Sequence, residues 1–210
     1  VNGCPWDKVQ THTSIRMNFL EEAYEAVDAL DLDDPVLMCE ELGDVLMQVA
    51  FHTCMEQETG RFTWEQVCDG VCQKLIERHP NIFGTQPGYE GITDWDALKN
   101  KEKGRTTLAD ELGTVPATLP ALMRAQKLQK RADRCGAAQP DKTRAQQALQ
   151  DALDSWSREQ NARTAGELLF AAANAMRLAG VDAEEALTFA SKRFCAGLLE
   201  QEPQSGTQVE

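Results

Sequence analysis

The sequence contains no apolar run that could cross a membrane as a helix. No segment reaches the ~18 apolar residues that a transmembrane helix needs, and no signal peptide is recognisable. The seven cysteines are an odd number, and no two of them form a CxxC pair. These absences argue against a secreted disulfide scaffold and against a membrane partner. We expect a soluble cytoplasmic protein.

Two of the cysteines, Cys68 and Cys72, stand four residues apart, so a helix would place both thiols on one face. Such a pair could bind a metal ion. The favoured interpretation is that they are small buried side chains in a reducing cytosol, where free cysteines behave as apolar residues.

Positive charge is scarce, especially in the first half of the chain. The net charge is −13, and residues 1–104 carry 20 acidic against 8 basic residues, whereas residues 105–210 carry 14 against 13. Binding to a nucleic-acid duplex requires Lys and Arg to neutralise phosphates, so an acidic half argues against that partner. A polyphosphate substrate is compatible with such a surface only if metal ions cancel the repulsion.

The alternating pattern of a β-strand is absent as well, and nearly every periodic stretch is helical. The pattern predicts helices over 13–30 and 35–58. A third helix is opened by the capping pair Thr63 and Gln66 and ends near Arg78. After a loop over 81–92, a fourth helix follows Thr93 and stops near Gly104. Four helices with short connections predict an all-α bundle.

The second half predicts further helices: a basic amphipathic one over 121–134, then others over 143–160, 163–179 and 183–200. Residues 43–47 align with 166–170, and residues 65–67 with 184–186, so we predict two copies of one helical unit. The predicted domains are a helical domain over 1–104, a connector with the basic helix over 105–142, a second helical repeat over 143–202, and a disordered tail over 203–210.

The feature that the sequence has in excess is carboxylate. Glu21, Glu22 and Glu25 share one edge of the first helix, and Glu41 and Asp44 are three residues apart on the second. The turn between these helices is marked by Asp34, the expected N-cap, and by Pro35 at the first helical position. An antiparallel pair of helices would bring the two carboxylate groups face to face.

Five acids on adjacent helix faces would repel one another and lose hydration unless a cation lay between them. Ligand sets made only of oxygen favour Mg²⁺ or Mn²⁺ over zinc. The alternative is a solvated acidic helix face. The apolar residues beside the acids weigh against it: Phe19, Leu20, Ala23, Val27, Leu30, Val45, Leu46, Val49 and Ala50. A carboxylate-bridged di-iron bundle is excluded, because no Glu-x-x-His pair occurs.

Several motifs in order resemble the MazG family of nucleoside triphosphate pyrophosphohydrolases. They are residues 4–8 (CPWDK), 10–12 (QTH), 20–25 (LEEAYE), 41–44 (ELGD), 78–80 (RHP) and 119–127 (LPALMRAQK). The resemblance covers nearly the whole chain. It implies an all-α fold and a tightly packed homodimer. It also implies Mg²⁺-dependent hydrolysis of nucleoside triphosphates to monophosphates and pyrophosphate, a reaction suited to clearing unwanted nucleotides from the pool.

The resemblance also implies roles for individual residues. The expected metal ligands are Glu22, Glu25, Glu41 and Asp44, and Glu21 is expected to orient or deprotonate the attacking water. The expected substrate contacts are Lys74 and Arg78 on the third helix and Trp95 on the fourth. Stacking on Trp95 would tolerate every base and so favour broad specificity. The three histidines are expected to take no part in catalysis.

The second copy lacks most of these groups. Thr164 stands at the position of Glu41 and Glu167 at that of Asp44, while Gly197 and Arg193 replace Arg78 and Lys74. The acids of the first helix align with Gln150, Asp151 and Asp154. We therefore assign the chemistry to the N-terminal half. The alternative is a catalytically weak dimeric protein that binds nucleotides as a regulator or scaffold.

Overall fold

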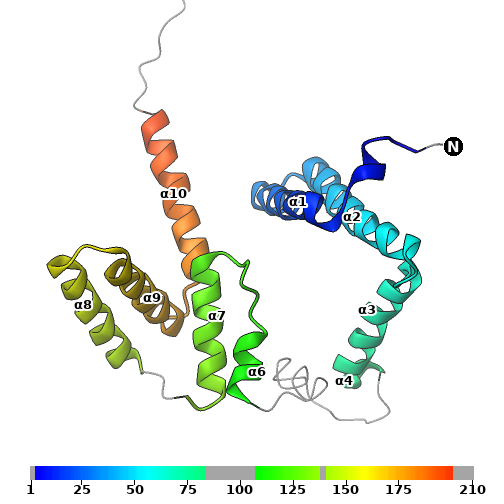
Figure 1. The fold of residues 1–210 in the computed structure, drawn as a ribbon. Helices are drawn as coiled ribbons and strands as arrows, with labels where there is room; N and C mark the ends of the chain where they lie inside the picture. Colours follow the sequence, from blue (N-terminus) through cyan, green and yellow to red (C-terminus); the bar gives the residue numbers. More distant parts are fainter. Residues whose placement is uncertain (1–2, 84–106, 138–140, 201–210) are drawn as a thin grey trace, which may run out of the picture. The chain divides into compact units, whose positions relative to one another are not determined.

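The computed structural model describes residues 3–83, 107–137 and 141–200. These residues form helices and no strand, which confirms the all-α class (Figure 1). The chain divides into two compact units, Val1–Leu98 and Lys99–Glu210, and each is described here by itself. No helix in the described part of the chain combines the length and the apolar character that crossing a membrane requires.

Unit 1 contains the 3₁₀ turn η1 (Asp7–Val9) and helices α1 (His12–Leu32), α2 (Pro35–Glu58), α3 (Trp64–Arg78) and α4 (Pro80–Phe83). Local signals in the sequence place the ends of the longer helices. The Asp34 carboxylate accepts hydrogen bonds from the backbone N–H groups of Val36 and Leu37, and Pro35 occupies the first turn, as predicted. The Thr63 and Gln66 capping box at the start of α3 is also confirmed.

Helices α1 and α2 pack along their length as an antiparallel pair, and α3 packs against α2 (Figure 1). The antiparallel register is visible in the contacts: His12, at the start of α1, meets Glu56 near the end of α2, and Glu22 meets Gln48. The helix α4 takes up the first residues of the predicted 81–92 loop. The rest of that loop and the predicted fourth helix lie outside the described residues.

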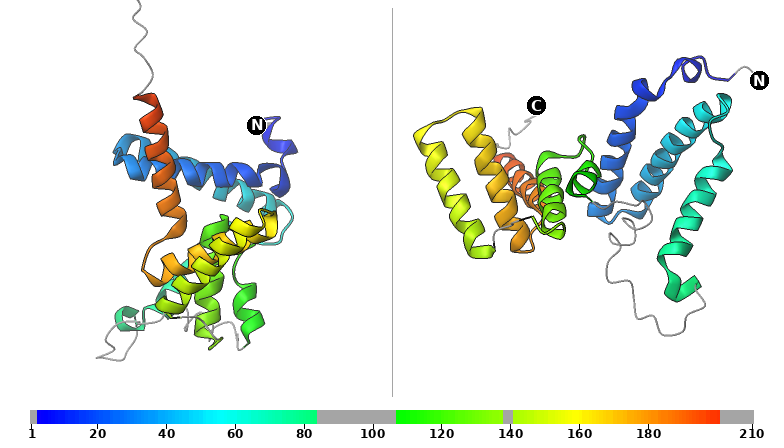
Figure 2. Two further views of the ribbon diagram at one scale, coloured as in Figure 1. Left: turned by 90° about the vertical axis from the view of Figure 1, so that its left-hand side faces the viewer. Right: turned by 60° about the horizontal axis from the view of Figure 1, so that its bottom comes forward.

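Unit 2 contains α6 (Leu108–Gly113), α7 (Ala121–Arg134), α8 (Lys142–Arg158), α9 (Ala162–Leu178) and α10 (Ala183–Leu199). The four long helices match the predicted ones to within two residues. Helix α6 was not predicted, since its residues were expected to belong to an irregular connector. In both figures α9 lies between α8 and α7 (Figures 1 and 2).

The core of unit 2 combines small apolar side chains with buried amides. Ala125, Ala173 and Ala183 are buried together, with Leu122 packed on them. The Gln126 side chain donates to the backbone carbonyls of Ala173 and Val181 and accepts from the backbone N–H of Ala183. The basic helix α7 is thus tied to α9 and α10 by its buried face.

The predicted repeat has a counterpart in the order of helices. Unit 1 begins with the tightly packed pair α1 and α2 followed by α3, and unit 2 ends with the pair α8 and α9 followed by α10. The repeat and the domain boundaries themselves stay predictions.

The expectation that the cysteines are buried is wrong for this chain. All seven are free and exposed: Cys4, Cys39, Cys54, Cys68, Cys72, Cys135 and Cys195. Cys68 and Cys72 lie on α3, a helix with no buried residue. The small apolar character of cysteine does not by itself select the buried face of a helix.

Candidate metal centre

Glu22 of α1 and Glu41 and Asp44 of α2 form a cluster of carboxylates, here called the acid triplet. Each residue offers an oxygen, and the three oxygens lie within 4.8 Å of one another. All three residues are half-buried. Three carboxylates at this spacing fit one hard divalent cation, because such ions bind oxygen ligands at about 2.0–2.6 Å.

The packing of α1 against α2 builds the acid triplet. Glu41 and Asp44 are almost one helical turn apart, so both side chains leave α2 on the same side. The antiparallel register then places Glu22 of α1 opposite them. No long loop takes part, because the two helices are joined by the short turn at Asp33 and Asp34.

Burial and the close approach of these acids raise the pKa of two of them, Glu22 and Glu41. Burial raises the pKa of the Glu22 carboxyl group, and the charges of Asp44 and Glu25 raise it further. The pKa of Glu41 is raised by the same causes, desolvation first and then the charges of Glu25 and Asp44. Neighbouring negative charges therefore oppose ionisation of Glu22 and Glu41, and a divalent cation would reverse that effect.

The other two predicted acids lie beside the triplet. Glu25 is exposed on α1, one turn beyond Glu22, and its charge acts on both Glu22 and Glu41. Glu21 is exposed on α1 as well. An exposed position on α1 is compatible with Glu25 as a metal ligand and with Glu21 as the residue that orients or deprotonates the attacking water. Both roles stay predictions.

The predicted substrate contacts lie on a different helix. Lys74 is exposed and Arg78 half-buried, one turn apart on α3. Trp95 lies outside the described residues, so its place in the site stays a prediction.

Two polar features of the α1–α2 interface were missed by sequence reasoning. Gln48 is buried, 6% exposed, and its amide nitrogen lies 3.4 Å from a carboxylate oxygen of Glu22. Further along, His12 contacts His52 through their Nδ1 atoms at 2.6 Å and Glu56 through Nε2 at 2.5 Å. Arg61 pairs with the other oxygen of Glu56 at 2.7 Å.

A signal for these residues was present in the sequence. Asp44, Gln48, His52 and Glu56 follow one another at intervals of four, so they form a polar stripe along one face of α2. The stripe faces α1, because Gln48 meets Glu22 and both His52 and Glu56 meet His12. The interface between the two helices therefore contains a polar stripe from Asp44 to Glu56 beside the buried apolar residues of α1.

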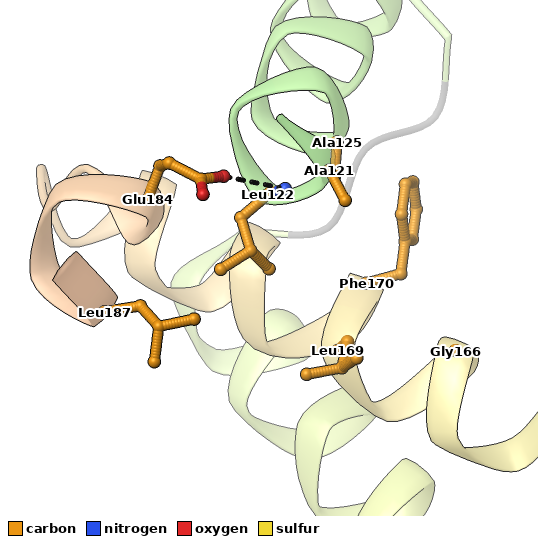
Figure 3. A pocket seen from close by; sticks show the side chains of 8 residues that line it. All are labelled: Ala121, Leu122, Ala125, Gly166, Leu169, Phe170, Glu184 and Leu187. Atoms are coloured by element: carbon orange, nitrogen blue, oxygen red, sulfur yellow. Dashed lines mark hydrogen bonds between the residues drawn. The ribbon is translucent and has the colours of Figure 1, made fainter. Parts of the chain in front are cut away.

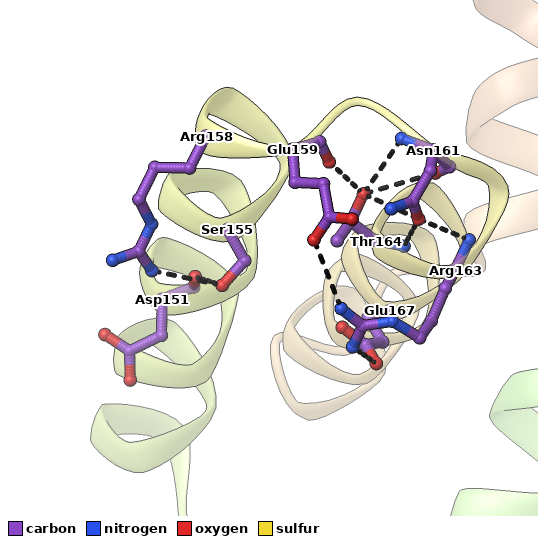
Figure 4. A network of polar contacts seen from close by, with 8 residues as sticks. All are labelled: Asp151, Ser155, Arg158, Glu159, Asn161, Arg163, Thr164 and Glu167. Carbon is purple, nitrogen blue, oxygen red and sulfur yellow. Dashed lines mark hydrogen bonds and ion pairs between the residues drawn. The ribbon is translucent and has the colours of Figure 1, made fainter.

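In the predicted second copy, the positions aligned with these acids serve local structure instead (Figure 4). Thr164, aligned with Glu41, is 2% exposed, and its hydroxyl donates to the backbone carbonyl of Glu159 at 2.6 Å. Its backbone N–H donates to the side chain of Asn161, the N-cap of α9. Glu167, aligned with Asp44, pairs with Arg163 at 3.0 Å.

The aligned acids of α8 are likewise engaged within their own helix. Asp151 accepts a hydrogen bond from Gln147 at 2.9 Å, and Asp154 accepts one from Gln150 at 3.0 Å. Among the described residues of unit 2, no group of potential ligands comparable to the acid triplet is found.

Comparison with known proteins gives consistent similarities. A family model described as the MazG nucleotide pyrophosphohydrolase domain matches residues 10–83. A Thermotoga maritima protein named nucleoside triphosphate pyrophosphohydrolase/pyrophosphatase MazG is 37% identical over 196 residues, covering 91% of this chain and 76% of that protein. An Escherichia coli K12 protein named nucleoside triphosphate pyrophosphohydrolase is 38% identical over 208 residues, covering 92% and 78%. A Bacillus subtilis protein, the uncharacterized YabN, is 44% identical over 132 residues, covering 61% and 27%.

Proposed function

The chain belongs to the MazG family of nucleotide pyrophosphohydrolases, and we propose that it hydrolyses nucleoside triphosphates to monophosphates and pyrophosphate. The acid triplet carries this proposal, because three half-buried carboxylates from two helices converge where a divalent cation would fit. The names of the relatives supply the class of reaction, and unit 1 supplies a site suited to it.

The proposed ion is Mg²⁺, with Mn²⁺ as a substitute. Glu22, Glu41 and Asp44 would hold it, with Glu25 completing the ligand set from the exposed side of α1. The oxygen-only donor set favours these hard cations. Magnesium bound here would neutralise phosphate oxygens and lower the pKa of a bound water.

The remaining groups would position the substrate. Glu21 would orient the attacking water or accept its proton, and Lys74 and Arg78 would bind the phosphates from α3. Arg78 can bind a phosphate through two parallel N–H groups. Trp95 would stack on the base.

We further propose that the active form is a homodimer. Helix α1 buries Ile15, Ala26 and Ala29 on one face. Its opposite face exposes a second apolar row, formed by Leu20, Tyr24 and Val27. A helix that is apolar on two faces is stable between two partners, and a second copy of unit 1 is the partner that we propose. Sedimentation equilibrium tests this: a monomer at micromolar concentration would contradict it.

The second candidate function is a dimeric protein that binds nucleotides as a regulator or scaffold, with little or no turnover. Unit 2 favours this candidate, because Thr164, which aligns with Glu41, bonds to Asn161 and Glu159 at the start of α9 instead of joining an acidic cluster. The enzyme would release pyrophosphate from nucleoside triphosphates, whereas the regulator or scaffold would bind nucleotides with little or no release.

The test is pyrophosphate release from a panel of canonical, oxidised and deaminated nucleoside triphosphates, with and without Mg²⁺. We expect release that requires Mg²⁺ and falls by about 100-fold or more in Glu41→Gln, because the variant loses an anionic ligand. The metal-free unfolding midpoint of the variant should equal or exceed that of the wild type, since neighbouring charges oppose ionisation of Glu41.

The matched control is Glu40→Gln, which removes an exposed acid next to Glu41 that is outside the triplet. It should retain most of the activity. If Glu41→Gln releases pyrophosphate as fast as the wild type, the assignment of the site is wrong. Nucleotide binding without release from any substrate would support the regulatory alternative.

A further inference from the structure

Gln48 is a buried amide at the edge of the acid triplet. It lies one helical turn beyond Asp44 on α2 and is only 6% exposed. Its Nε2 atom donates to a carboxylate oxygen of Glu22 at 3.4 Å, a long hydrogen bond. Its Oε1 atom is buried and accepts no hydrogen bond from the described residues.

The chemistry of the amide fixes which end faces which partner. A carboxylate can only accept hydrogen bonds, so the NH₂ group must face Glu22. The carbonyl oxygen is bonded to the same carbon atom, points away from the NH₂ group and is shielded from solvent. A buried acceptor without a donor costs free energy, and an apolar side chain of similar size would avoid that cost. The carbonyl oxygen of Gln48 lowers the stability of the empty site, and its presence is explained if the occupied site supplies the missing hydrogen-bond donor.

We propose that Gln48 is a positioning residue of the metal centre. Its NH₂ group holds the Glu22 carboxylate toward Glu41 and Asp44, and its carbonyl oxygen gains its missing donor when cation binding rearranges the site. This inference rests on the proposed function, because it requires that the triplet binds a divalent cation. Hydrogen bonds of this kind to metal ligands orient them and raise affinity for the ion.

A purely structural amide is the competing explanation, and the two make opposite predictions for the metal-free protein. If Gln48 serves packing, its replacement lowers the stability of the empty protein. If it serves the occupied site, an apolar residue of similar length removes an unsatisfied acceptor, and the empty protein is as stable as before or more stable.

The experiment uses Gln48→Met, which keeps the length of the side chain and removes both donor and acceptor. Calorimetric titration with MgCl₂ in the absence of nucleotide gives the metal affinity, and thermal unfolding with and without Mg²⁺ gives the stability. We expect Mg²⁺ affinity to fall about 10- to 100-fold, the range seen when such supporting bonds are lost. The metal-free midpoint should not fall. High Mg²⁺ should restore most of the pyrophosphate release.

Thr53→Val is the matched control. Thr53 is 4% exposed on the same helix, and its hydroxyl donates to the backbone carbonyl of Val49, away from the triplet. This variant should keep wild-type Mg²⁺ affinity. Gln48→Leu serves as a second variant with the same expected results if Gln48→Met does not fold.

Two outcomes overturn the inference alone: Gln48→Met binding Mg²⁺ as tightly as the wild type, or Thr53→Val losing as much affinity as Gln48→Met. In both cases wild-type activity with Mg²⁺ leaves the proposed function in place. A wild-type protein that neither takes up Mg²⁺ nor releases pyrophosphate overturns the proposed function and this inference together.

Discussion

The contact between His12 and His52 restricts how many protons the pair can hold. His12 Nε2 must carry a hydrogen to meet the Glu56 carboxylate, and the two Nδ1 atoms must share one hydrogen between them. If both rings were doubly protonated, two N–H groups would point at each other. Burial lowers the pKa of His52, and the charge of His12 lowers it further.

This arrangement predicts the pH dependence of stability. The pKa of His52 in the folded state lies below its unfolded value of about 6.5, so at mildly acidic pH the unfolded chain binds more protons. The contribution of His52 to the free energy of unfolding is therefore complete above its unfolded pKa of about 6.5, and it is lost as the pH falls through the lower pKa of the folded state. The slope is at most about 1.4 kcal/mol per pH unit, the limit for one proton.

His52→Gln removes the titrating ring and should flatten this part of the curve. The quantity to measure is the difference in unfolding free energy between wild type and variant from pH 7.5 to pH 5.5, because titration of the acid triplet cancels in it. A difference that does not change with pH would show that His52 binds protons equally in both states.

At the scale of single residues, the sequence allowed the acid triplet to be predicted but not its neighbours. Helical spacing and one short turn predicted that acids of α1 and α2 face one another, but they did not single out Glu22 from Glu21 and Glu25. Gln48 and His52 owe their roles to what α1 presents opposite them. The periodicity of α2 alone does not show which residues of α1 lie opposite Gln48 and His52. The spacing of four from Asp44 to Glu56 did indicate a polar stripe on α2.

At the scale of elements, Glu184 is a residue of α10 whose side chain acts on another helix. The N-cap residue of helix α7 is Pro120, whose side chain makes no capping hydrogen bond. Glu184 of α10 fills that role, since its carboxylate accepts from the backbone N–H groups of Leu122 at 3.1 Å and Met123 at 3.2 Å (Figure 3). The same residue lines an apolar cavity of about 420 Å³ with Leu169 and Leu187.

Glu184→Ala should destabilise unit 2 by about 0.5–2 kcal/mol, the usual cost of losing an N-cap. Glu185→Ala is the control, because Glu184 and Glu185 both lie in the first turn of α10 and interact alike with its dipole. The difference between the two variants in urea unfolding reports the bonds to α7. Equal losses would mean that the capping contact contributes nothing.

The helix boundaries were predictable where the chain carries capping chemistry. Asp34 with Pro35, and Thr63 with Gln66, gave the starts of α2 and α3, because such residues satisfy the first backbone N–H groups. The short helices α4 and α6 were not predicted. A helix of four or six residues completes too few turns for its apolar periodicity to be recognised.

At the scale of the whole molecule, the two units differ in the contacts that their aligned positions make. Unit 1 gathers acids, whereas unit 2 uses the aligned positions to start α9 and to pair side chains within helices. The proposed chemistry therefore belongs to unit 1. The aligned pair of cations, Lys74 on α3 and Arg193 on α10, provides a test because both are exposed.

We expect Arg193→Ala to leave pyrophosphate release within about twofold of wild type, and Lys74→Ala to lower it about tenfold, roughly the loss of one favourable contact to phosphate. Steady-state kinetics with a saturating nucleoside triphosphate and Mg²⁺ measures both. A large loss in Arg193→Ala together with an active Lys74→Ala would move the chemistry to unit 2.

The polar stripe between α1 and α2 has a consequence for how this protein responds to its surroundings. A helical hairpin joined only by apolar contacts is largely indifferent to ions, but this stripe carries the acid triplet at one end and the contacts of His52 and Glu56 with His12 at the other. Asp44 and Glu56 are separated by about 18 Å along α2, so depletion of divalent salt acts on the hairpin at the first place and protonation of His52 at the second. The solvent composition of the cell would then set the rigidity of unit 1.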